Sequence, residues 1–167
     1  MSLAREIGKR GPFDCPEQEA MLNLLRTAAV LAEPIDCIFR SADLSAPAYN
    51  ILRILRGHGE PLPCGSIAAE MIARVPDMTR LVDRLEKKEL VARLRCAEDR
   101  RVVPIAITAK GKRLLKKLDP LVLAEHRRSM ARLSRQELNT LSRLLTKARD
   151  TDRAPGKSSP RHYVLDL

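Results

Sequence analysis

Apolar side chains between residues 16 and 149 recur mostly at steps of three and four, which is the spacing of one face of an α-helix. The pattern predicts helices over about 16–40, 45–57, 66–73 and 76–88, and two more within 109–149, the last beginning at Ser134. Pro34 and Pro120 fall inside two of these stretches, where a proline removes a hydrogen bond and is expected to bend or break the helix.

The period changes after residue 90, where two short β-prone runs flank a charged turn over 95–101. Two such runs predict a β-hairpin. Three helices followed by a hairpin are the order of a winged helix-turn-helix, so we expect a mainly α fold with a small β-hairpin wing (α+β). The winged part covers about 44–108, and helices over about 16–40 and 109–149 flank it.

The two ends of the chain differ from this periodic part. Residues 1–14 are polar and contain two glycines and a proline, which predicts a flexible arm. Residues 151–167 are rich in proline, serine and charge, which predicts a disordered tail. A single domain over 15–150 is therefore expected.

The charge of the chain is concentrated. The net charge is +10, and residues 91–118 hold nine Lys or Arg against two acidic residues. Such a segment predicts a polyanionic partner, and nucleic acid is favoured over an anionic membrane. Aromatic residues make up only 2%, which argues against base stacking on single strands and favours double-stranded DNA.

No apolar run approaches the roughly 20 residues of a membrane span, and no secretory signal is recognisable, so a cytoplasmic protein is expected. The four cysteines include no CxxC pair, and no nucleophile elbow or glycine-rich phosphate loop occurs. We therefore expect neither a metal site, nor a cofactor, nor an enzyme. The histidines are expected at the surface. Cys37 should be buried on the apolar side of its helix, whereas Cys15, at a helix start that favours a thiolate, is a candidate redox residue.

The 76–88 helix is the candidate reader of DNA, because an α-helix fits the major groove and its first turns reach base edges. A helical wheel separates an apolar side from a polar one. The candidate contact residues on or beside the polar side are Pro76, Asp77, Thr79, Arg80 and Arg84. The alternative for these positions is an ordinary solvated face.

The turn of the predicted hairpin carries a second group of candidates: Arg95, Asp99, Arg100 and Arg101. Arginines on a projecting turn can enter the narrow minor groove, where the negative potential is enhanced. Asp99 could cap the turn, orient a neighbouring guanidinium, or do both.

The residues between 44 and 118 resemble the MarR family of bacterial regulators. Thr79-Arg80-Leu81-Val82-Asp83-Arg84-Leu85-Glu86 is similar to the recognition-helix signature, Asp99-Arg100-Arg101 to the D-x-R wing motif, and Ile107-Thr108-Ala109-Lys110-Gly111 to the strand-to-helix junction. The chain departs from the family at residues 73–77, where Gly-Leu is common, and at Glu89, where glycine is common.

The resemblance implies a homodimer on a pseudo-palindromic operator, near its own gene or a neighbouring one. It implies recognition helices in successive major grooves and wings in the flanking minor grooves. It also implies that a small-molecule effector, often phenolic, or an oxidant releases the DNA. Repressor is the expected role.

Two alternatives to this function stay open. One is a winged-helix protein-interaction module that does not read DNA, and the other is a cysteine-based redox-sensing regulator that uses Cys15. The convergence of Arg80, Arg84, Arg100 and Arg101 on one expected face favours DNA, since a protein-only module has no need of it.

Overall fold

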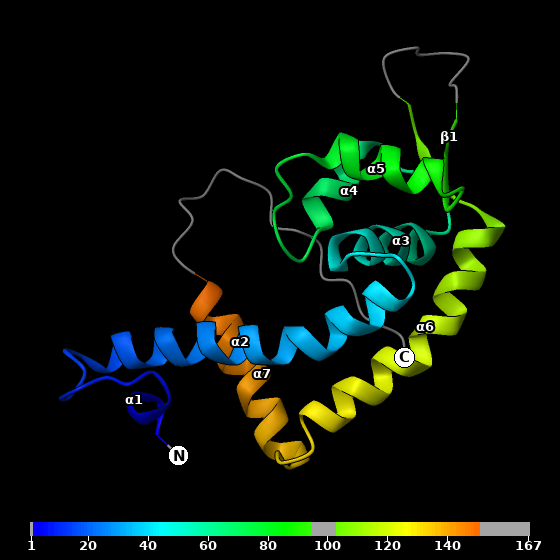
Figure 1. Ribbon diagram of the computed structural model, residues 1–167. Coiled ribbons are helices and arrows are strands. Elements are labelled where there is room, and N and C mark those ends of the chain that lie inside the picture. Colours follow the sequence, from blue (N-terminus) through cyan, green and yellow to red (C-terminus); the bar gives the residue numbers. More distant parts are fainter. Residues whose placement is uncertain (1, 95–102, 151–167) are drawn as a thin grey trace.

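The computed structural model describes residues 2–94 and 103–150, and the helices and strands within them are shown in Figure 1. Their order along the chain is α1 (Leu3–Glu6), α2 (Pro16–Ser41), α3 (Ala46–His58), α4 (Cys64–Glu70), α5 (Met78–Lys87), β1 (Val91–Arg93), β2 (Ile105–Ile107), α6 (Ala109–Ser129) and α7 (Arg135–Arg149). The mainly helical fold with a small hairpin is therefore confirmed.

Side-chain caps define several of these helix ends as the sequence predicts. The Ser45 hydroxyl accepts a hydrogen bond from the Ala48 N–H at the start of α3, and Gly59 ends the helix with a left-handed φ of 75°. The Ser134–Glu137 capping box is present at the start of α7. These local signals are strong because each one satisfies backbone groups that the helix leaves without partners.

Four local expectations need correction. Leu3–Glu6 form a helix with Leu3 buried, where a flexible arm was expected. Helix α2 continues through Pro34, so this proline does not break its helix, whereas α6 continues through Pro120 as the sequence predicted. Helix α4 ends at Glu70 rather than near residue 73, and α5 begins at Met78 rather than at Pro76.

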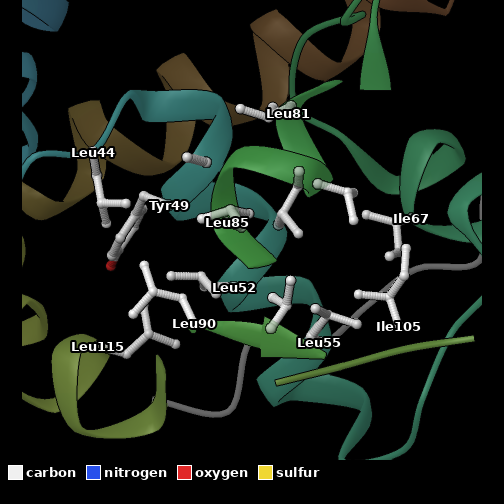
Figure 2. Close-up of a cluster of buried hydrophobic side chains, with 14 of the residues drawn as sticks. Leu44, Tyr49, Leu52, Leu55, Ile67, Leu81, Leu85, Leu90, Ile105 and Leu115 are labelled. Carbon is white, nitrogen blue, oxygen red and sulfur yellow. The ribbon is translucent and has the colours of Figure 1, made fainter. Parts of the chain in front are cut away.

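The hydrophobic core lies between α3, α5, the hairpin and the first half of α6 (Figure 2). Strand β1 pairs antiparallel with β2, with Val91 opposite Ile107 and Arg93 opposite Ile105. Leu62, which precedes α4, exchanges backbone hydrogen bonds of 2.8 and 2.9 Å with Ile105 and so extends the sheet by one bridge. The α5 helix is thereby packed on a rigid base.

A partly buried polar cluster joins α3 to α6. Asp119 accepts hydrogen bonds from Arg56 Nη1 at 2.5 Å and from the Tyr49 hydroxyl at 3.3 Å, and Arg53 lies 3.5 Å away. Burial by itself raises the pKa of Asp119, but the hydrogen bond from Arg56 and the nearby guanidinium charges hold this pKa below its ordinary value. The ion pair therefore connects α6 to α3.

Gly111 lies where α6 approaches the hairpin most closely. A Cβ atom at this position would lie 2.8 Å from Ile107 Cγ1 and in direct overlap with the carbonyl oxygen of Leu90. Only a residue without a side chain fits there, which gives a physical reason for the glycine in the strand-to-helix junction.

We expect Gly111→Ala to lower the free energy of unfolding by about 1–3 kcal/mol, because the methyl group overlaps backbone that cannot move alone. Chemical denaturation followed by circular dichroism measures the change. Gly57→Ala is the matched control: it lies within α3 with nothing inside 4 Å of the added Cβ, so it should be neutral or slightly stabilising. Equal stability of the two variants would contradict this role of Gly111.

Candidate nucleic-acid interface

The surface of α5 divides into a buried and an exposed side. Met78, Leu81, Val82 and Leu85 are all buried against the core, at spacings of three and four residues. Thr79, Arg80 and Arg84 are exposed. The burial of the apolar stripe thus determines that these three polar side chains face outward.

Asp77 organises the first turn of α5. Its Oδ1 accepts a hydrogen bond from the Arg80 N–H at 3.1 Å, which caps the helix, and its Oδ2 lies 3.0 Å from Arg80 Nε. The Arg80 side chain is nevertheless 84% exposed. Because the ion pair uses Nε, it orients the guanidinium without occupying its two terminal amino groups.

Pro76 lies outside α5, in the connection that follows α4, and it is exposed. The Ile72 N–H in the same connection donates to the Asn50 side-chain oxygen on α3 at 2.9 Å. Residues 73–77, which depart from the family pattern, therefore belong to the segment that connects α4 to α5 and do not form the first turn of α5.

Arg93 of β1 clamps the hairpin to α5, which the sequence analysis did not foresee. Its two terminal amino groups lie 2.5 Å from Asp83 Oδ1 and 2.5 Å from Glu86 Oε2, and its backbone N–H donates to Glu86 Oε1 at 3.0 Å. The hydrogen bond that Arg93 donates to Asp83 is the main cause that raises the pKa of Arg93. The Asp83 carboxylate on α5 is thus paired with a residue of the hairpin.

Glu89 occupies the turn between α5 and β1 with a φ of 59°, in the left-handed region that favours glycine. Its backbone oxygen accepts a hydrogen bond from the Thr108 hydroxyl at 2.7 Å, and Lys110 Nζ lies 2.8 Å from its carboxylate. The hydrogen bond from Lys110 lowers the pKa of Glu89. Contacts with the start of α6 therefore hold the turn in the shape that glycine would adopt readily.

The other candidates are distributed as follows. Arg95, Asp99, Arg100 and Arg101 lie outside the described residues. Cys15 is exposed at the N-cap of α2. Two expectations were wrong: Cys37 is exposed, with its sulfur 2.9 Å from Arg40 Nη2, and His58 is half-buried beside Glu70, with 2.9 Å between Nε2 and Oε2.

Residues 2–94 and 103–150 contain no group of three or more His, Cys, Asp or Glu side chains placed to hold a metal ion. No helix within these ranges is both long enough and apolar enough to cross a membrane.

Comparison with known proteins decides the family. The MarR family model matches residues 44–103. The HTH-type transcriptional regulator YfiV of Bacillus subtilis is 35% identical over 64% of this chain and 71% of the relative. The MarR transcription factor from Planctomyces limnophilus is 42% identical over 81% of this chain and 99% of that chain, with a TM-score of 0.64. The chain belongs to the MarR family.

A more distant solved structure shares the fold. BpsR of Bordetella bronchiseptica, whose DNA binding is regulated by 6-hydroxynicotinic acid, has a TM-score of 0.73 at 22% identity, over 85% of this chain and all of that chain. As a MarR-family transcriptional regulator, the chain is a DNA-binding winged-helix protein.

We expect Arg93→Met to loosen the hairpin from α5. The free energy of unfolding should fall by about 1 kcal/mol, the upper range for a partly exposed ion pair. Hydrogen exchange at the amides of β1 and β2 should accelerate as well. Arg84→Met is the control, because it removes an exposed arginine of α5 and should change stability by less than about 0.5 kcal/mol. Unchanged exchange in Arg93→Met would contradict the clamp.

Proposed function

We propose that this MarR-family regulator is a cytoplasmic repressor that binds a pseudo-palindromic operator as a homodimer and is released by a small-molecule effector. The observation that carries the proposal is the orientation of Arg80: its side chain is 84% exposed at the start of α5 and is held by Asp77. An arginine presented in this way suits the two acceptors of a guanine in the major groove.

Each candidate residue has a role in this proposal. Arg80 reads a base, and the neighbouring Pro76, Asp77 and Thr79 shape the surface that meets base edges. Arg84, one turn further along α5, binds phosphate. The candidates of the hairpin turn, Arg95, Arg100 and Arg101, enter the flanking minor groove, with Asp99 orienting the guanidinium groups.

A second chain is proposed because α2 and α7 expose large apolar side chains. Met21 and Leu25 of α2 are 57% and 59% exposed, Val30 is 53% exposed, and Leu144 of α7 is 50% exposed. Within the described residues α7 has no buried side chain, and an open hollow on its surface is lined by Leu141, Leu144 and polar neighbours. Such surfaces suit a two-fold interface that buries the same patch on both chains.

A small-molecule effector is proposed from the family. The DNA binding of BpsR responds to 6-hydroxynicotinic acid, and this chain shares its fold. The proposed place for an effector is between the long flanking helices and the winged part, where binding would alter the spacing of the two recognition helices.

The experiment that tests the proposal separates base reading from general adhesion to DNA. DNA selected from a random pool by the purified protein supplies the operator, and competition binding compares it with random DNA. Arg80→Ala should lower the ratio of specific to non-specific affinity, because it removes a base contact. The expected loss of discrimination corresponds to about 1–3 kcal/mol. Arg84→Ala is the matched arginine variant and should weaken both affinities alike, because phosphate contacts carry no sequence information.

An unchanged ratio for Arg80→Ala would show that another group reads the bases. Selection that enriches no sequence at all would contradict the proposed function as a whole.

We also expect a dimer in solution. Sedimentation equilibrium at micromolar concentration should give a mass near twice the 18.7 kDa of the chain. Leu25→Glu together with Leu144→Glu should shift this mass toward the monomer, since both charges would lie within the proposed interface. A monomer that still bound its palindrome tightly would contradict the dimer.

A further inference from the structure

A second basic surface lies on α6, outside the recognition helix and the hairpin. Its members are exposed side chains in the first nine residues of the helix: Lys112, Arg113, Lys116 and Lys117. At the angular spacing of an α-helix they cover an arc of about 140°. The buried residues Gly111, Leu115 and Leu118 occupy the opposite side. We call these four residues the α6 basic face.

The α6 basic face has no internal compensation among residues 2–94 and 103–150. Many other cations in these ranges lie beside a carboxylate: Arg40 with Glu33, Arg56 with Asp119, Arg80 with Asp77, Arg93 with Asp83, Lys110 with Glu89 and Arg128 with Glu125. No ion pair within the described ranges includes a member of the α6 basic face.

Like charges also repel each other within this face. Lys112 and Lys116 are four residues apart on one helix, as are Arg113 and Lys117, and like charges at this spacing destabilise a helix. A partner that is itself a dense anion would relieve this repulsion.

The position of the α6 basic face indicates which anion it meets. Helix α6 begins directly after β2, with Thr108 as its N-cap, so all four side chains arise within about 14 Å of the hairpin base along the helix axis. Figure 1 shows α6 descending from the base of the hairpin on the side away from α5. A duplex that lies across α5 and continues beyond the hairpin would pass this end of α6.

We propose that the α6 basic face binds the phosphate backbone of DNA that flanks the operator half-site, beyond the hairpin. This inference rests on the proposed DNA-bound dimer and extends its footprint outward on both sides. The contact is to phosphates, so it strengthens binding without reading the sequence of the flanking duplex.

The test uses the full-length protein and the DNA site that it selects, in two lengths. The short probe is the selected site alone, and the long probe adds twelve base pairs of arbitrary sequence on each side. At low salt the long probe should bind about tenfold more tightly to the parent, and the slope of log affinity against log salt should steepen by about 0.9 for each added phosphate contact.

Lys112→Gln with Lys116→Gln should abolish most of this gain and leave affinity for the short probe unchanged. Arg127→Gln with Arg132→Gln is the matched control, because it removes the same charge from exposed sites at and beyond the far end of α6. This control should keep the gain.

An equal gain from flanking DNA in the parent and in the Lys112/Lys116 variant would overturn the inference and leave the face to a protein partner. The same holds if the parent shows no gain from the flanks. In both cases tight binding of the short probe would leave the proposed operator function standing, so the two failures are distinguishable.

Discussion

The burial of one apolar stripe on α5 determines how the rest of the surface is presented. Met78, Leu81, Val82 and Leu85 pack into a core shared with α3, the hairpin and α6, and no rotation of α5 would keep all four buried. Burying such side chains contributes about 1.5–3 kcal/mol each, which far exceeds the effect of any single surface charge. The outward direction of Arg80 and Arg84 follows from this packing.

Three further contacts join α5, the hairpin and the helices around them. Arg93 holds the hairpin to α5 through Asp83 and Glu86, and the close approach of Gly111 to Leu90 joins the hairpin base to α6. Asp119 and Arg56 then couple α6 to α3. The elements proposed to meet DNA are therefore linked to α6 and α3 by short, specific contacts.

The periodic parts of the sequence predicted the fold well because burial and capping are local signals. The α5 stripe, the Ser45 and Ser134 caps and the hairpin runs all depend on residues within one or two turns of each other. Helix boundaries were predicted less accurately. Helix α2 continues through Pro34, and α5 begins at Met78 rather than at Pro76.

Side-chain partners were harder to foresee than elements. Arg93 was counted only as part of a basic segment, because its pairing with Asp83 and Glu86 depends on how the hairpin folds back onto α5. Cys37 was assigned to the apolar side of α2, yet it lies toward solvent beside Arg40. The exposure of Thr79, Arg80 and Arg84, in contrast, followed from the helical wheel, because the apolar side of the wheel is the side that packs into the core.

Hydroxyl-radical footprinting of the protein on its selected DNA site tests most directly whether α5 and the hairpin form the DNA-binding surface of a two-fold dimer. The prediction is two equivalent protected half-sites, with centres about one helical turn or a multiple of it apart, each bounded on its outer side by minor-groove protection from the hairpin. A single protected segment without two-fold symmetry, or protection that is independent of DNA sequence, would contradict it.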